Sequence, residues 1–67
     1  MNFSEHIKEL ATLIARVKSL NETDLNDELI AEMFQLEELV EKRIKTIEEE
    51  FIPSATSEEQ NLFSILK

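Results

Sequence analysis

The sequence predicts an all-α protein, built as an antiparallel helical hairpin that carries a short third helix. The 67 residues include no glycine and a single proline, so few positions oppose helix formation. Hydrophobic residues make up 42% of the chain and charged residues 33%, a balance typical of folded rather than disordered proteins. Apolar residues also recur every three or four positions, as on one face of a helix. We therefore treat residues 1–67 as a single helical domain.

The first helix is expected at about residues 4–20. Its apolar residues step alternately by four and three positions, which suits a seam packed against another helix as in a coiled coil. The seam consists of Phe3, Ile7, Leu10, Ile14 and Val17. Asn2 or Ser4 is expected to cap the helix, because a short polar side chain accepts hydrogen bonds from unpaired backbone N–H groups. The polar residues 21–24 predict a tight turn, with Asn21 in the left-handed conformation.

The second helix is expected at about residues 24–51, with Thr23 or Asp24 as its N-cap. Its apolar residues repeat every eleven positions, which is close to three turns of an unstrained helix, so we expect a long and nearly straight element. The repeat joins Leu25, Leu36 and Ile47, then Leu29, Val40 and Phe51, then Met33 and Ile44. Pro53 disfavours helical geometry at the residue before it and places the end of this helix near Phe51.

A short third helix is expected at about residues 58–66, after a capping box formed by Ser57 and Gln60. An isolated helix of this length is marginal in water, so it needs a surface to lie on. The first helix is too short to cover the last turns of the second, and the third helix can fold back there. Alternatively, apolar residues of those turns stay partly open for a second subunit or another protein. These residues are Ile44, Ile47 and Phe51.

The charge balance argues against two classes of partner. Fifteen acidic and seven basic residues give a net charge of −8, which repels both phosphate backbones and anionic lipid surfaces. We therefore expect neither a nucleic acid nor a membrane as partner. The N-terminal segment lacks the basic start and the apolar stretch of a signal peptide, so the cytoplasm is the expected compartment.

The reactive side chains predict no enzyme, no cofactor, no metal site and no small-molecule substrate. The chain has no cysteine, no tyrosine and no glycine-rich loop, and no nucleophile stands beside a base on one helix face. His6 lies among charged residues of the first turn, so we expect it to be an exposed surface residue. The glutamates at 48–50 and the basic cluster Lys42, Arg43 and Lys45 are expected to be solvated surface.

The sequence has more apolar residues than a helical hairpin needs. Leu13 and Leu20 lie beside the first seam, and further large apolar residues lie beside the second stripe and in the third helix. The predicted protein interface consists of Leu13, Ile30, Phe34, Leu39, Phe51, Leu62, Phe63, Ile65 and Leu66. Two uses of this surplus are open: a homodimeric four-helix-type bundle, or a surface reserved for a different protein. The two are compatible if the dimer opens.

The sequence resembles the start of FliT-type flagellar export chaperones, which are small, acidic, helical bacterial cytoplasmic proteins. The resemblance is carried by two helices joined at residues 21–24, by the stretch from Leu39 to Ile47, and by the proline break before a third amphipathic segment. It implies binding of a filament-cap or export-apparatus protein through the apolar faces of the later helices. On this chain those faces hold Phe51, Leu62, Phe63, Ile65 and Leu66. Members of that family usually continue further, so a self-regulating C-terminal helix is not part of the resemblance.

Two other families share features with the chain. The helix–turn–helix arrangement is similar to Rop, a dimeric four-helix bundle that binds RNA, although the acidic balance argues against RNA here. The segment from Asn2 to Leu25 also resembles the small subunit of exonuclease VII, but the central glycine of that family is absent. The sequence as a whole predicts a small acidic adaptor or chaperone that binds another protein. The alternative is a structural dimeric module or a small non-catalytic subunit of a larger complex.

Overall fold

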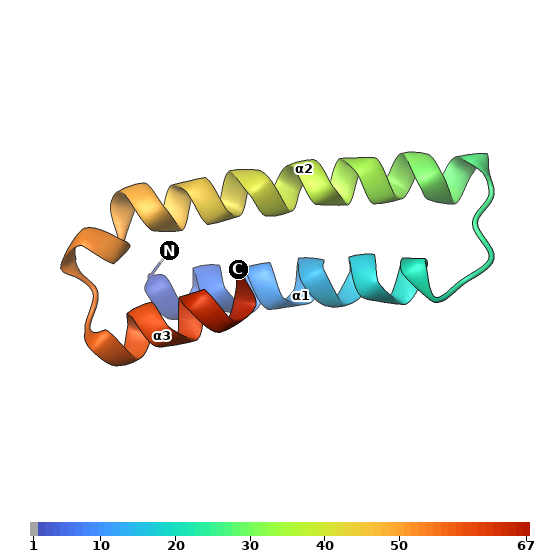
Figure 1. The fold of residues 1–67 in the computed structure, drawn as a ribbon. Coiled ribbons are helices and arrows are strands. Elements are labelled where there is room, and N and C mark those ends of the chain that lie inside the picture. Colours follow the sequence, from blue (N-terminus) through green and yellow to red (C-terminus); the bar gives the residue numbers. More distant parts are fainter. Residues whose placement is uncertain (1) are drawn as a thin grey trace.

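The computed structural model describes residues 2–67, which form three α-helices and one short 3-10 segment, with no strand among them. The elements are α1 (Phe3–Asn21), α2 (Asp27–Glu50), η1 (Ile52–Ser54) and α3 (Ser57–Leu66). Helices α1 and α2 run antiparallel, and α3 folds back beside the N-terminal half of α1 (Figure 1). The predicted all-α hairpin with a short third helix is confirmed, whereas its assembly into a dimeric bundle stays a prediction.

Helix α1 begins where the sequence predicts, and α2 begins later. Asn2 caps α1, because its side-chain oxygen accepts a hydrogen bond of 2.9 Å from the backbone N–H of Glu5. In α2 the same role falls to Asn26, whose side chain accepts from the N–H of Leu29 at 2.9 Å. The prediction of Thr23 or Asp24 as the cap is therefore wrong. With Asn26 as the cap, Asp27 and Glu28 lie in the first turn of α2, where the positive end of the helix dipole stabilises their negative charges.

The turn between α1 and α2 is closed without a left-handed residue. Asn21 is the last residue of α1, and no residue from 2 to 67 has a positive φ angle, so the prediction for Asn21 is wrong. The end of α1 is instead satisfied by hydrogen bonds that reach back three residues, from the N–H groups of Glu22 and Thr23, both at 3.2 Å. The hydroxyl of Thr23 adds a bond of 3.0 Å to the carbonyl of Ser19. These bonds supply donors for the free carbonyls of the last turn.

Pro53 ends α2 as predicted. The helix stops at Glu50, and the proline lies in η1, where its missing N–H is not needed. The capping box of α3 is formed one residue earlier than predicted, by Thr56 and Glu59. The N–H of Glu59 donates to the Thr56 hydroxyl at 3.1 Å, and the Glu59 carboxylate accepts from the N–H of Thr56 at 2.9 Å. The prediction of Ser57 and Gln60 as this box is therefore wrong.

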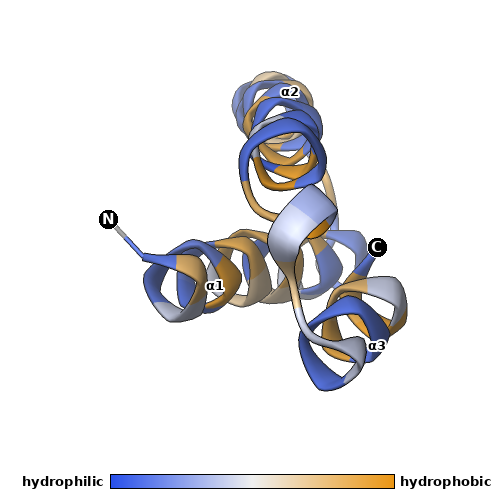
Figure 2. Cartoon of the chain, turned by 90° about the vertical axis from the view of Figure 1, so that its left-hand side faces the viewer, coloured by the Kyte–Doolittle hydropathy of each residue, from blue (hydrophilic) through white to orange (hydrophobic). Residues whose placement is uncertain are grey.

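The core lies where all three helices meet. Viewed from the η1 end, the helices occupy the corners of a triangle and turn their apolar sides inward (Figure 2). Leu10 of α1 and Ile47 of α2 have no exposed surface, and Phe63 of α3 closes the cluster. Partly buried residues packed around them are Phe3, Ile14, Val40, Ile44, Phe51, Ile52 and Leu66. Helix α3 therefore covers the last turns of α2, so of the two predicted arrangements the folded-back helix is the one observed.

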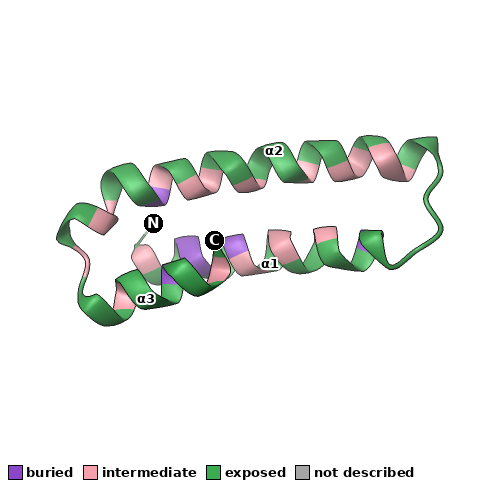
Figure 3. Ribbon diagram, viewed as in Figure 1, coloured by how far each residue is buried: buried purple, intermediate pink, exposed green. Residues whose placement is uncertain are grey.

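Burial is unequal along the molecule, which measures 42 × 17 × 16 Å. The buried residues concentrate at the end that α3 covers, and Leu20 is the buried residue nearest the turn (Figure 3). Toward the turn only α1 and α2 lie against each other, so each helix keeps an open side. Within residues 2–67, no helix combines the length and the apolar character needed to cross a membrane.

Candidate protein-binding surfaces

The structure exposes four of the nine residues predicted to form an interface. Phe34 is 62% exposed, Leu39 48%, Leu62 44% and Ile65 80%. Four others are half-buried: Leu13, Ile30, Phe51 and Leu66. Phe63 differs from all of these, because it is 4% exposed and belongs to the core cluster. Its side chain is committed to holding α3 in place and is not part of the outer surface.

The exposed apolar residues of the hairpin lie on two opposite sides of it. Leu13 of α1 and Leu39 of α2 line one groove together. A different groove is lined by Val17 of α1 and by Glu37 and Val40 of α2. Leu39 and Glu37 are two residues apart, and at about 100° per residue their side chains point roughly 160° apart around the helix. We call the side with Leu13 and Leu39 the ion-pair flank and the other side the α3 flank.

The ion-pair flank is bridged by two ion pairs between α1 and α2. Arg16 donates to one carboxylate oxygen of Glu32 through Nη2 at 3.0 Å and through Nε at 3.2 Å. Closer to the core, Arg43 of α2 pairs with Glu9 of α1 at 2.5 Å. Leu13 lies between Glu9 and Arg16 along α1, spaced by four and three residues. The charged pairs therefore stand on both sides of the apolar contact and fix how the two helices are aligned.

His6 is buried on this flank, which corrects the prediction that it is exposed. It is 8% exposed, its ring lies 4.8 Å from that of Phe51, and Arg43 Nη1 lies 2.9 Å from its Nδ1. A guanidinium has donors and no acceptor, so Nδ1 accepts this bond and the ring proton is on Nε2. The sequence contained a signal for this burial, because His6 stands three residues after Phe3 and four before Leu10, on the seam side of α1.

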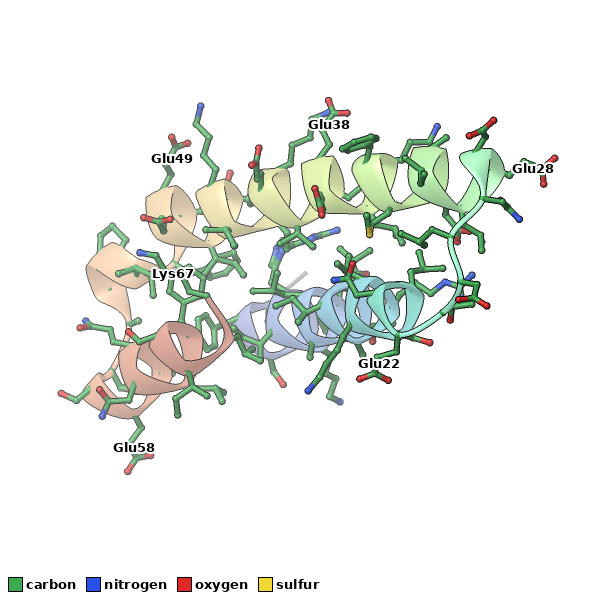
Figure 4. All side chains as sticks on the ribbon, turned by 45° about the vertical axis from the view of Figure 1, so that its right-hand side comes forward. Glu22, Glu28, Glu38, Glu49, Glu58 and Lys67 are labelled. Atoms are coloured by element: carbon green, nitrogen blue, oxygen red, sulfur yellow. The ribbon has the colours of Figure 1, made fainter. Side chains whose placement is uncertain are left out.

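The α3 flank is occupied by α3 at one end only. Phe63 enters the core there, and Lys67, directly after α3, lies 3.8 Å from Glu48 of α2. Figure 4 shows the Lys67 side chain between α3 and α2. Farther toward the turn, a groove between α1 and α2 continues along this flank. We call it the open groove, and it is lined by Ile14, Val17, Lys18, Asn21, Glu37, Val40 and Glu41.

One side of α2 connects the position of α3 with the open groove. The residues on this side succeed one another by alternating steps of four and three, which keeps them in one row along a helix. They are Ile30, Phe34, Glu37, Glu41, Ile44 and Glu48. Glu48 contacts Lys67, while Glu37 and Glu41 line the open groove. Ile30 and Phe34 therefore continue the same row beyond the groove, on the opposite flank from Leu13 and Leu39.

The half of the hairpin with the open groove carries most of the negative charge. Residues 14–41 contain eight acidic residues and two basic ones, so they hold six of the eight net negative charges. The acidic residues are Glu22, Asp24, Asp27, Glu28, Glu32, Glu37, Glu38 and Glu41, and the basic ones are Arg16 and Lys18. Arg16 is paired with Glu32 on the ion-pair flank, which leaves Lys18 as the basic residue lining the open groove.

The remaining charged clusters offer no further site. Lys42 pairs with Glu38 at 3.8 Å, and Arg43 contacts both Glu9 and His6. Among the residues that the structure describes, no three His, Cys, Asp or Glu side chains are grouped so that they could hold a metal ion. The two flanks are therefore the candidate functional surfaces.

No protein-family model matches this chain, and no curated protein or solved structure is significantly similar to it. The resemblances to FliT-type chaperones, to Rop and to the small subunit of exonuclease VII therefore stay predictions from the sequence. The function is accordingly inferred from the chain's own surfaces.

Proposed function

We propose that this chain is a small, acidic, non-catalytic adaptor or chaperone of the cytoplasm, which holds another protein against an apolar helix face. The observation that carries the proposal is the uncovered part of the α3 flank. There Phe34, 62% exposed, continues the row of α2 residues whose far end, Glu48, lies 3.8 Å from Lys67, the residue directly after α3. Single exposed leucines are ordinary, whereas a large aromatic side chain that extends an existing packing groove is typical of a binding surface.

A narrower form of the proposal is a flagellar export chaperone of the FliT type. In this case the docking surface includes the outer side of α3, where Leu62 and Ile65 are three residues apart and both exposed. Phe51 and Leu66 border the core beside them and are half-buried. The exposed apolar side of α3 supports this form, and the identity of the partner rests on the resemblance alone.

The ion-pair flank supports a second candidate, a structural homodimer. Leu39 is 48% exposed and lines a groove with Leu13, so a second hairpin could cover both side chains in a four-helix-type bundle. The charged residues lining that groove have both signs, since Glu9 stands among Lys8, Lys42 and Arg43. Two copies could therefore face each other there without strong repulsion.

Light scattering over a concentration series, combined with thiol labelling, separates the two candidates. The chain has no cysteine, so a Phe34→Cys variant and a Gln35→Cys control each carry one thiol for a maleimide reagent. The adaptor proposal predicts a monomer or a readily dissociating dimer, in which both thiols react at similar rates. A concentration-independent dimer that protects the thiol of the Phe34→Cys variant would refute the adaptor proposal, because a second copy would then cover the α3 flank. The structural module through the ion-pair flank predicts instead a concentration-independent dimer that protects the thiol of a Leu39→Cys variant.

A further inference from the structure

The row of α2 residues along the α3 flank also indicates what kind of partner fits. Resting on the proposed function, we propose that the open groove binds one amphipathic helix of basic character from another protein, placed end to end with α3. Four features carry this inference: the continuity of the groove with the α3 packing site, the apolar residues that line it, the charges beside them, and its length.

The continuity shows that a helix fits this side of the hairpin. Helix α3 has ten residues and a length of about 15 Å, at roughly 1.5 Å per residue. The molecule is 42 Å long, so α3 covers about a third of it. Along the same row of α2, the next positions after those beside α3 are Glu41 and Glu37, which line the open groove. A second helix placed there extends the three-helix packing of the core toward the turn.

The lining of the groove specifies an amphipathic helix. Ile14 and Val17 of α1 and Val40 of α2 supply apolar surface between the two helices. Phe34 and Ile30 extend this surface along α2 toward the turn. A partner therefore needs apolar residues repeated every three or four positions on one face, which is the standard way in which a helix binds to a groove.

The charges beside this apolar surface select basic residues on the partner. Glu37 and Glu41 are four residues apart, so their carboxylates stand on successive turns of one wall of the groove. Lys or Arg side chains at similar spacing on the partner can pair with both. The excess of acidic residues between 14 and 41 also attracts a basic segment from a distance and raises its rate of association.

The same charges argue against a second copy of this chain as the occupant. Each copy would bring two glutamates, Glu37 and Glu41, and one lysine, Lys18, into the contact, within a half of the hairpin that holds six of the eight net negative charges. Facing helices are 8–10 Å apart, about one Debye length at 0.1 M salt, so this repulsion is only partly screened. A homodimer through the ion-pair flank does not meet this obstacle, because the charges there are mixed.

The length of the open part sets the size of the partner segment. From Glu41 to Ile30 the row spans eleven residues of α2, or about 17 Å at roughly 1.5 Å per residue. A helix of about three to four turns fills this length. The ligand class is therefore a short basic amphipathic helix.

The test titrates the full chain with fluorescent peptides of about 14 residues, which is roughly four helical turns. One peptide carries leucines on one helical face and lysines beside them, a second has glutamates in place of the lysines, and a third is a scrambled form of the first. We expect the first to bind roughly tenfold more tightly than either of the others. NMR shift changes should centre on Val17, Phe34 and Val40, which belong to the groove or to its continuation along α2.

Charge-reversed variants test the groove itself. Glu37 and Glu41 are exposed, so the double variant Glu37→Lys/Glu41→Lys is expected to keep the fold. This double variant should bind the basic peptide roughly tenfold more weakly than the wild type does, and should bind the acidic peptide more tightly. The matched control Glu38→Lys/Glu49→Lys makes the same charge change at side chains that point away from α1 (Figure 4). The control variant should lose much less affinity for the basic peptide than the Glu37→Lys/Glu41→Lys variant does.

Several results would overturn the inference. These are equal affinity for the basic and acidic peptides, an equal effect of the two double variants, or self-association of the full chain with shifts at Phe34 and Val40. Binding of the basic peptide at Leu62 and Ile65, or at Leu13 and Leu39, would also overturn it but leave the proposed function standing. The proposed function fails separately, through a permanent dimer in the light-scattering and labelling experiment.

Discussion

Arg43 of α2 connects the two long helices through two polar contacts with α1. Its guanidinium lies 2.9 Å from Nδ1 of the buried His6 and also pairs with Glu9, so one side chain of α2 contacts two residues of the first two turns of α1. The Phe51 ring packs against the His6 ring at a tilt of 54°, with the ring centroids 4.8 Å apart. Buried polar atoms that lose their partner cost more than exposed ones, because they are also cut off from water.

Replacing Arg43 by methionine keeps the aliphatic length and removes both contacts. We expect a loss of about 1–3 kcal/mol in the free energy of unfolding, because Nδ1 of His6 is left buried without its donor. The matched variant Arg16→Met removes an ion pair whose side chains are 51% and 40% exposed, and should cost only about 0.2–1 kcal/mol. Urea denaturation measures the free energy of unfolding of both variants. Equal losses would mean that the His6 contact does not contribute to stability.

At the scale of the elements, periodicity identified the helices but not their exact starts. Between residues 21 and 27 the sequence offers five residues able to cap a helix, so local pattern alone could not choose Asn26 over Asp24. The candidate surface was limited in the same way. The spacing of the apolar residues indicated more apolar surface than a hairpin needs, but placing Leu39 and Phe34 on opposite flanks required knowing how α2 faces α1. Similarly, only the docked position of α3 assigns Phe63 to the core.

The cap of α2 gives a direct test at this scale. Asn26→Ala should lower the free energy of unfolding by about 1 kcal/mol, because the N–H of Leu29 loses its side-chain acceptor. Asp24→Ala, at one of the two positions predicted from the sequence, should change stability by less than about 0.5 kcal/mol. Thermal or urea unfolding followed by circular dichroism compares the two. A larger loss for Asp24→Ala would place the start of α2 earlier than the structure does.

The docking of α3 depends on one deeply buried side chain. Phe63→Ala should cost about 3–5 kcal/mol, which is comparable to the whole net stability of a single core of this size. We therefore expect a large fall in the melting temperature, and the milder Phe63→Leu variant should lie between it and the wild type. Ile65, on the same helix, is 80% exposed, so Ile65→Ala should leave the melting temperature nearly unchanged. Equal effects at the two positions would mean that α3 is not held against the hairpin as observed.

At the scale of the whole molecule, stability and charge are concentrated at opposite ends. The fully buried residues Leu10 and Ile47 lie where α3 completes the three-helix core, and six of the eight net negative charges lie in residues 14–41. Repulsion among the negative charges of that half opposes close packing of α1 and α2. That half also makes fewer apolar contacts, because α3 does not reach it (Figure 1). The end that offers a surface for binding is thus also the end that the chain itself stabilises least. Binding surfaces are often found in the less stable part of a protein, where local opening lets the surface change conformation when a partner binds.

Hydrogen exchange should show this division as a gradient along both long helices. Amides of α1 and α2 around Leu10 and Ile47 should exchange slowest, because opening them requires breaking the three-helix core. Amides around Val17 and Met33 should exchange faster, by local opening of the turn-side half, even though all four positions lie inside helices. In the Phe63→Ala variant the gradient should flatten because exchange at the core end becomes faster, since that end then also consists of two helices.

A basic helix bound in the open groove should also flatten the gradient, but by slowing exchange around Val17 and Met33. Uniform exchange in the wild-type chain would show instead that the hairpin opens as one unit and that the turn-side half is as stable as the core end.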